Sequence, residues 1–255
     1  MLKKRLIFSL LVSEDLFVLS RNFNLQKVGD LDWIRKNYNF NLISETVDEL
    51  VVLNVSRKEK NIDSFCKVVE KLSHNCFIPL STGGGIKNIH DAHKLLNSGS
   101  DKLVLNSSFY YNQKLVNEIA YTYGNQCIIC SIDYKLENGV HQVYTSNGSK
   151  KVEITLKEAV KNAYDLGAGE IYLTCINKDG TGQGIDIATI IEVSKHTKLQ
   201  IIASGGIGRT SHMIEALTID NVDSISTANL FYFMGDGLQE SRAEIKNSGI
   251  QLASW

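Results

Sequence analysis

One apolar run in the chain ends in a carboxylate that could move protons. Residues 127–133 read CIICSID, and a carboxyl group at the end of a strand, here Asp133, can act as a general acid or base. Glycine clusters follow two other apolar runs, at 83–85 and 205–208. Glycines let backbone N–H groups approach an anion closely, so the clusters indicate a ligand with a phosphate at each end. The same glycines could instead simply make tight turns.

An internal repeat of about 122 positions places these residues. The run 5–11 recurs at 127–133, the run 48–53 at 169–174, the segment 80–84 at 202–206, and 101–103 at 223–225. Four strand-like runs therefore occur in the same order in each half, which predicts two fused half-units. The two halves differ at the position of the candidate acid or base, because the counterpart of Asp133 is Leu11.

Apolar runs alternate with amphipathic segments along the whole chain. We expect strands at 5–11, 50–54, 77–82, 102–106, 127–133, 170–174, 199–204 and 223–227. We expect helices near 31–46, 61–73, 88–98, 113–122, 156–166, 186–196, 210–219 and 234–247. This pattern predicts an α/β fold, a (β/α)8 TIM barrel built from two fused (β/α)4 half-barrels, as a single domain over 1–255. A doubly wound sheet is disfavoured, because its glycine fingerprint after the first strand is absent.

Composition narrows the function classes. The 255 residues are 43% hydrophobic with a net charge of −1, which leaves no electrostatic footprint for nucleic acid or an anionic membrane. Five scattered cysteines favour a reducing, cytoplasmic setting over a disulfide framework. The basic and apolar start of the chain resembles a signal peptide, but its match to 127–133 identifies it as a core strand. No cofactor or metal is expected.

The expected barrel has its active site at the carboxyl ends of the strands. The candidates for ligand binding are the segments that follow strands at this end, namely 82–85, 179–182, 204–208 and 227–229. The stretch 134–152, with a turn at 137–139, predicts a hairpin that could act as a lid over Asp133.

These motifs carry a resemblance to a known family. The chain resembles the cyclase subunit of imidazole glycerol phosphate synthase, the HisF family. The matching segments, in order, are 1–5, 48–50, 82–86, 101–102, 106–107, 126, 132–133, 167–170, 179–181 and 203–206. The resemblance covers nearly the whole chain. It implies that a separate HisH-type glutaminase docks at the bottom of the barrel and releases ammonia, which crosses the core. At the top, the ammonia would meet a bisphosphorylated ribulosyl-formimino intermediate.

The resemblance also assigns residues. The two phosphates of the ligand would be held by Gly85, Asn106, Ser107, Asp179, Gly180, Thr181, Gly206, Ala228 and Asn229. The glutaminase would face Asp101 and Gln126.

Four charged residues at strand starts would form the ammonia gate. The resemblance implies a salt-bridged ring of Arg5, Glu49, Lys102 and Glu170. Buried charges demand partners, so two positive and two negative residues make a coherent set. The alternative is four solvated charges at the ends of strands.

The departures from the family pattern gather at the catalytic face. The family uses two carboxylates as acid and base, and Leu11 replaces the first of them, leaving Asp133. Other positions that differ from the usual family residue are Ser9, Leu19, Asn54 and Asn229. Leu11 could merely extend the core, but no proton donor remains at that position in either case.

Three hypotheses follow. The changes are most similar to second-copy HisF-type proteins of the glycosyl amidation-associated (WbuZ-type) group, in which the barrel conducts ammonia to a sugar amidotransferase of surface-saccharide synthesis, with weakened or lost cyclase activity. The second is a working cyclase of histidine biosynthesis that uses Asp133 alone or recruits Glu14 or Asp15. The third is a related barrel with another phosphosugar reaction, such as an isomerisation.

Overall fold

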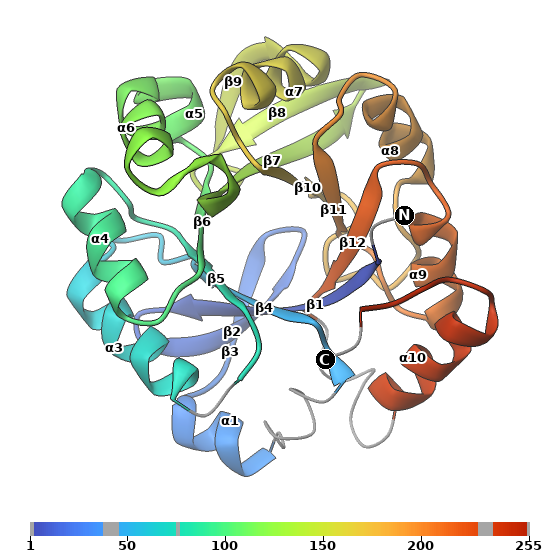
Figure 1. Ribbon diagram of the computed structural model, residues 1–255, viewed down its shortest axis with the longest axis horizontal. Helices are drawn as coiled ribbons and strands as arrows, with labels where there is room; N and C mark the ends of the chain where they lie inside the picture. The colour runs from blue at the N-terminus through green and yellow to red at the C-terminus, as the bar shows by residue number, and fades with distance from the viewer. Residues whose placement is uncertain (1–2, 38–45, 75–76, 229–236, 254–255) are drawn as a thin grey trace.

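A closed barrel of parallel strands forms the centre of the molecule. The computed structural model describes residues 3–37, 46–74, 77–228 and 237–253. Eight strands of this described part pair in parallel, and β10 pairs with β7 to close the ring (Figure 1). In barrel order they are β1 (Arg5–Ser13), β4 (Glu49–Asn54), β5 (Leu80–Gly83), β6 (Lys102–Leu105), β7 (Ile128–Glu137), β10 (Glu170–Cys175), β11 (Gln200–Ser204) and β12 (Val222–Thr227). The predicted (β/α)8 barrel is confirmed.

Helices cover the outside of the barrel, one or more after most strands (Figure 1). They bury one apolar stripe against the strands, as amphipathic helices do. An example of sequence-encoded boundaries is Thr155, which forms a capping box with Glu158 before its helix. The helices are α1 (Leu31–Asn37), α3 (Ile62–Ser73), α4 (Ile89–Asn97), α5 (Ser108–Tyr111), α6 (Gln113–Tyr123), α7 (Leu156–Asp165), α8 (Ile187–Ser194), α9 (Thr210–Leu217) and α10 (Gly237–Asn247), with a 3-10 turn η1 (Asn125–Cys127).

Several element boundaries differ from the expected ones. The strand expected at 77–82 begins only at Leu80, because Phe77 is exposed and Pro79 has no N–H to donate. The strand expected from 127 begins at Ile128, after η1. The helices expected at 31–46 and 234–247 are described over 31–37 and 237–247, and 38–45 and 234–236 lie outside the described residues.

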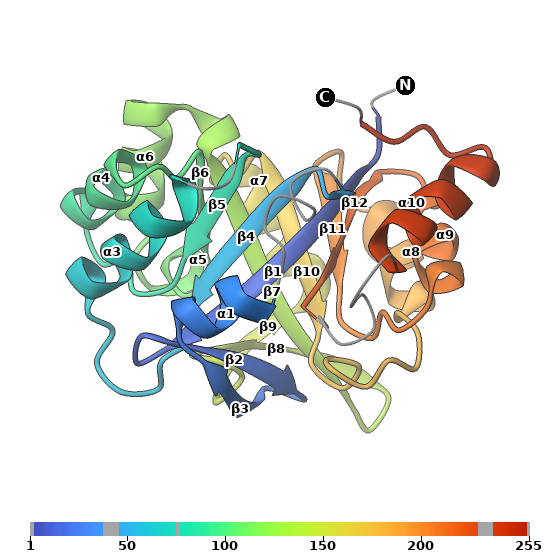
Figure 2. The same ribbon diagram turned by 90° about the horizontal axis from the view of Figure 1, so that it is seen from below.

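Two antiparallel hairpins extend the barrel beyond the carboxyl ends of β1 and β7. The predicted hairpin after β7 is present: Asn138 and Gly139 turn with φ of 50° and 78°, and β8 (Val140–Thr145) is followed by β9 (Lys150–Thr155). The segment after β1, to which the sequence assigned no strand or helix before 31, is also a hairpin, of β2 (Leu16–Arg21) and β3 (Asn24–Gly29). Both lie at the same end of the barrel (Figure 2).

The apolar core has two parts. The larger lies between the strands and the surrounding helices. The smaller fills the inside of the barrel and consists of Ile7, Val51, Val104, Ile129, Tyr172 and Ile202. Such interior layers make a TIM barrel a packed core rather than an open pore. None of the helices in the described residues is long and apolar enough to cross a membrane.

Candidate functional site

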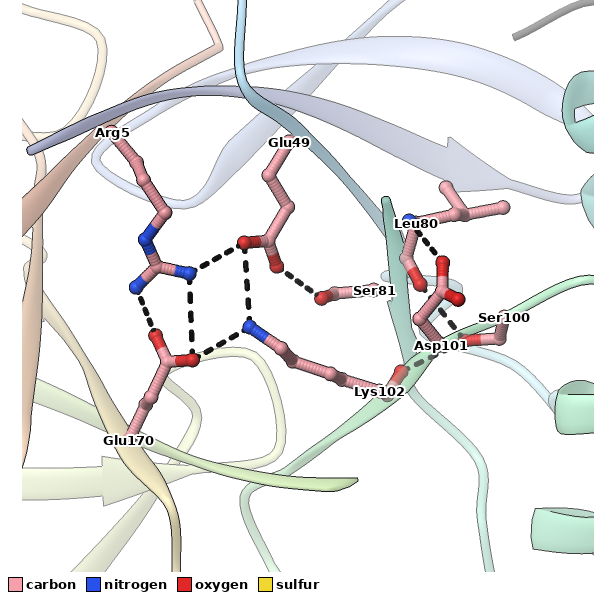
Figure 3. A network of polar contacts seen from close by, with 8 residues as sticks. All are labelled: Arg5, Glu49, Leu80, Ser81, Ser100, Asp101, Lys102 and Glu170. Atoms are coloured by element: carbon pink, nitrogen blue, oxygen red, sulfur yellow. Dashed lines mark hydrogen bonds and ion pairs between the residues drawn. The ribbon is translucent and has the colours of Figure 1, made fainter. Parts of the chain in front are cut away.

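Four charged side chains close the amino-terminal end of the barrel. Arg5 donates to Glu49 Oε2 at 2.7 Å and to Glu170 Oε2 at 2.5 Å, and Lys102 Nζ lies 3.4 Å from Glu49 and 2.6 Å from Glu170 (Figure 3). Each cation therefore touches both carboxylates, and the charges alternate around the ring. The predicted set of four residues is brought together, and the alternative of four solvated charges is wrong.

Burial and the ion-pair partners shift the pKa values of the ring residues in opposite directions. Burial by itself would lower the pKa of Arg5 and raise that of Glu170. The facing charges outweigh it, so the pKa of Arg5 is raised and the pKa of Glu170 is lowered. Glu49 is almost fully buried and receives a further hydrogen bond of 2.5 Å from Ser81 Oγ. The ring is thus a charged, hydrogen-bonded closure, as buried ions require.

Above the ring, the barrel interior becomes apolar and then polar again. The apolar layer of the small core is followed by three hydroxyl groups: Ser9 Oγ lies 2.8 Å from Tyr172 Oη and 2.6 Å from Ser226 Oγ, and Tyr172 donates to Ser226 at 2.9 Å. All three side chains are buried. Tyr172 joins the two layers, because it belongs to the apolar cluster and ends in the hydroxyl group.

A pocket opens at the carboxyl ends of the strands, and Asp133 lies in it. The Asp133 carboxylate accepts hydrogen bonds from Ser131 Oγ at 3.2 Å and from Asn106 Nδ2 at 3.3 Å. Ser146 and Asn147, from the turn between β8 and β9, line the same pocket. The inserted stretch therefore reaches the pocket of Asp133 through the turn between β8 and β9, and its action as a lid stays a prediction.

Burial sets the acidity of Asp133. Its pKa is raised to about 7, mainly by desolvation and further by Asp179, against the lowering effects of the hydrogen bond from Ser131 and of Lys60. A carboxyl group that titrates near neutrality can both accept and donate a proton in that range. Asp133 thus has the properties of a general acid or base.

Leu11 lines this pocket as well, from β1. It pairs in register with Leu53 of β4 and offers no proton donor. Glu14 and Asp15, the acids considered as substitutes for the missing carboxylate, do not line this pocket. Glu14 pairs with Lys58, and Asp15 accepts from Ser64 Oγ at 2.5 Å. β7 therefore contributes a carboxylate to the pocket, Asp133, and β1 contributes none at the equivalent position, Leu11.

The predicted phosphate residues fall into two adjoining pockets. Gly85, Asn106 and Ser107 line the pocket of Asp133. The second pocket is lined by Asp179, Gly180, Gly206 and Ala228, of which Asp179 and Ala228 also line the first. Thr181 lines neither, and its hydroxyl donates to the Lys178 carbonyl at 2.7 Å. Asn229 lies outside the described residues.

The repeat is visible in how the glycines approach the neighbouring strand. Gly84 has φ +96°, and an added Cβ would lie 2.1 Å from the Asn54 carbonyl oxygen. Gly205, one position before the aligned counterpart Gly206, has φ +92° and would meet the Cys175 carbonyl oxygen at 2.7 Å. Both turns need glycine for conformation and for space. The tight-turn explanation of the glycines is therefore correct, and it coexists with their place in the two pockets.

The residues predicted to face a glutaminase lie at the other end, near the ring. Asp101 immediately precedes β6 and Gln126 lies in η1 before β7, and both are exposed. Asp101 Oδ2 accepts from the Leu80 backbone N–H at 2.8 Å, and Gln126 donates to the Tyr123 carbonyl (Figure 3 for Asp101).

Comparison with known proteins agrees with this geometry. A family model described as "Histidine biosynthesis protein" matches residues 34–235. Over its whole length the chain is 38% identical to a protein of Parasynechococcus marenigrum, provisionally named imidazole glycerol phosphate synthase subunit hisF2, and covers 95% of it. It is 36% identical to the imidazole glycerol phosphate synthase subunit HisF of Bacillus cereus and 35% to that of Flavobacterium psychrophilum, with 99% of each chain covered.

The chain belongs to the HisF family. Within this HisF-type barrel, the sequence missed two groups of residues near the site. The hairpin β2–β3 brings Ser20, Phe23 and Leu25 into the wall of the first pocket. Lys60, in the segment between β4 and α3, lines the same pocket. A lysine in an irregular loop carries no periodic signal, so only the fold places it.

Proposed function

We propose that this HisF-type chain docks a HisH-type glutaminase at the amino-terminal end of its barrel and conducts the released ammonia to the opposite end. The ammonia would then serve the amidation of a surface-saccharide precursor by a sugar amidotransferase, with the barrel's own cyclase activity weakened or lost. The observation that carries this proposal is the contrast between a complete charged ring and a pocket that Leu11 lines together with the single acid–base candidate Asp133.

The ring supports a gate for a small neutral molecule. Its side chains meet over the barrel axis, so a passing molecule must separate at least one ion pair, such as Lys102 with Glu170 at 2.6 Å. Lysine holds its charge on a flexible stem, which makes it the more movable cation of the two. Beyond the ring, the apolar layer around Val51 and Ile129 favours neutral ammonia over ammonium, because an unpaired ion is costly there.

The pocket supports a weakened reaction. Loss of one positioned acid or base lowers rates by about 10²- to 10⁴-fold. At 1.36 kcal/mol per factor of ten, this raises the barrier by roughly 3 to 5 kcal/mol. The two pockets would still hold a phosphorylated ligand, through Gly85, Asn106 and Ser107 on one side and Asp179, Gly180 and Gly206 on the other, with Ala228 lining both. The resemblance alone adds Thr181 and Asn229.

A second function is supported by one specific observation. Asp133 has a pKa of about 7 and accepts hydrogen bonds from Ser131 and Asn106, which is the state expected of a working acid–base group. The second candidate is therefore an active cyclase subunit of imidazole glycerol phosphate synthase that relies on Asp133 alone.

Turnover of the bisphosphorylated ribulosyl-formimino substrate separates the two candidates. The purified chain and its Leu11→Asp variant are assayed in saturating ammonium salt, which removes any need for a glutaminase. Under the ammonia-conducting proposal, the natural chain turns over about 10²-fold or more slowly than Leu11→Asp. Equal and efficient turnover by both proteins would support the cyclase instead. Release of ammonia into solution from glutamine by the assembled glutaminase, without cyclase product, is the complementary readout.

A further inference from the structure

Lys60 places an unbalanced positive charge in the wall of the first pocket. It lies in the segment between β4 and α3 and is half-buried. Among the described residues it makes no hydrogen bond and no ion pair. The nearby Lys58 behaves differently, since its ammonium group is exposed to solvent and lies 3.1 Å from Glu14.

The stem of Lys60 is held against a glycine of the same pocket. A Cβ added to Gly85 would lie 2.9 Å from Lys60 Cβ and 3.4 Å from its Cδ. Gly85 therefore makes room for the lysine stem, and both residues line the pocket with Asn106 and Ser107. A stem packed in this way costs less ordering when the amine binds a ligand than a free surface lysine does.

The positive charge of Lys60 is only partly compensated by the negative charge in the first pocket. Burial lowers the pKa of Lys60, and the neighbouring Asp133 raises it only in part, so the net direction is down. Asp133 itself has a pKa of about 7 and is only partly ionised near neutrality. An anionic group bound beside Lys60 would supply the missing negative charge, and a phosphate would also accept from Asn106 and Ser107.

We propose that Lys60 is the cation by which the first pocket recognises a phosphate group of its ligand. This assignment rests on the proposal that the two pockets bind a phosphorylated molecule. Lys60 is the one cationic side chain of the described residues in the first pocket, and Arg21 is the one in the second. The ligand class is therefore a small molecule with an anionic group at each end, and Lys60 selects for charge at the β4–β6 side.

Ribose 5-phosphate is a suitable phosphomonoester probe, with ribose as its uncharged counterpart. Binding is followed by the shifts of backbone amide signals in the isotope-labelled full chain. The amides of Gly84, Gly85 and Ser107 report the first pocket, and those of Gly205 and Gly206 report the second. The second pocket thus serves as an internal control in every titration.

The matched variants are Lys60→Met, Lys60→Arg and Lys58→Met. We expect Lys60→Met to weaken phosphate-dependent binding at the first pocket by about tenfold or more, and to leave the second pocket unchanged. Lys60→Arg should bind within a few-fold of the natural chain, and Lys58→Met should match it. Equal affinity of Lys60→Met and the natural chain at the first pocket would overturn the role of Lys60 while leaving the phosphate pockets in place.

Two further outcomes are decisive. If ribose shifts the same amides as strongly as ribose 5-phosphate, the pocket does not recognise phosphate and Lys60 has no such role. If the natural chain shows no shifts in either pocket, the phosphate proposal itself fails. Ammonia conduction is measured separately with the glutaminase, so its failure would not be mistaken for either result.

Discussion

Arg5 and Glu170 are 165 positions apart in the chain, and their side chains meet at 2.5 Å at the amino-terminal end of the barrel. Arg5 begins β1 and Glu170 begins β10, so the pair joins the first strand to a strand of the second half (Figure 3). The contact exists because parallel strands start at one rim of the barrel. Any process that opens the barrel from below must disturb this pair or the adjoining pairs of Lys102.

Replacement of Glu170 should separate gated from ungated delivery of ammonia. Glu170→Leu removes two ion pairs and leaves Arg5 and Lys102 facing one carboxylate, Glu49. We expect glutamine-dependent transfer to change more than transfer from ammonium salt, measured side by side in the assembled complex. Equal changes in both assays would remove the gate from the proposal.

The same variant requires a stability control. Breaking a buried ion pair typically costs about 3 to 5 kcal/mol, so Glu170→Leu should lower the free energy of unfolding in urea. Glu153→Leu is the matched control, since Glu153 is exposed on β9 at the opposite end of the barrel. It should leave both the ammonia assays and the urea midpoint near those of the natural chain.

Asp133 should make stability depend on pH in the neutral range. Its pKa is about 7 in the folded chain, against a reference value of 3.8. The folded state therefore holds a proton that the unfolded state has lost between these values. The stabilisation that this proton contributes is fully present below pH 3.8 and is lost as the pH rises through about 7.

Asp133→Asn tests this dependence, because the amide cannot ionise. The variant should be more stable than the natural chain at pH 8, by at most roughly 4 kcal/mol at 1.36 kcal/mol per pKa unit, and similar to it near pH 4. Urea unfolding across this range measures the difference. Asp165→Asn, at an exposed position of α7, should show little difference at either pH. A constant difference for Asp133→Asn across the range would contradict the raised pKa.

The barrel could be predicted because its strands are encoded in a repeat, and the ring was predicted from the resemblance to the HisF family. Apolar runs that recur after about 122 positions identify the strands, and strand starts then place Arg5, Glu49, Lys102 and Glu170 on one rim. Position along a parallel strand determines which end of the barrel a residue reaches. The distances of 2.5 to 3.4 Å within the ring come from the structure, because strand position fixes the rim and not the side-chain contacts.

The hairpin β2–β3 could not be predicted, for a physical reason. Its turn uses Asn22 and Phe23 with φ of 51° and 62°, and the turn before it uses Glu14 and Asp15 with φ of 51° and 64°. Hairpin turns of this kind normally contain glycine, and a bulky side chain at positive φ is uncommon. Without Asn-Gly or Asp-Gly, the segment reads as a loop, and its residues in the pocket stayed unrecognised.

The tip of this hairpin is held by Asp179, which gives a prediction about access to the pocket. The Asp179 carboxylate accepts from Ser20 Oγ at 2.5 Å and from the Phe23 backbone N–H at 3.1 Å. Asp179→Ala should loosen the hairpin and speed tryptic cleavage after the exposed Arg21 by several-fold. Peptide mass analysis of timed digests measures the rate. Asp165→Ala should be cleaved there at the natural rate, and an unchanged rate for Asp179→Ala would show that other contacts hold the hairpin.

Asp101 should contribute to docking of the glutaminase. It is exposed beside the ring at the end of the barrel where ammonia would enter, while its Oδ2 atom accepts from the Leu80 N–H (Figure 3). Asp101→Ala should reduce stimulation of a HisH-type glutaminase by about tenfold, because removal of an interfacial charge weakens binding by roughly 1 to 2 kcal/mol. Asp101→Asn retains an oxygen for Leu80 but not the charge, and thus separates the two contributions. Loss of stimulation in the alanine variant alone would assign Asp101 to local structure, loss in both would assign it to docking, and full stimulation in both would place the docking surface elsewhere.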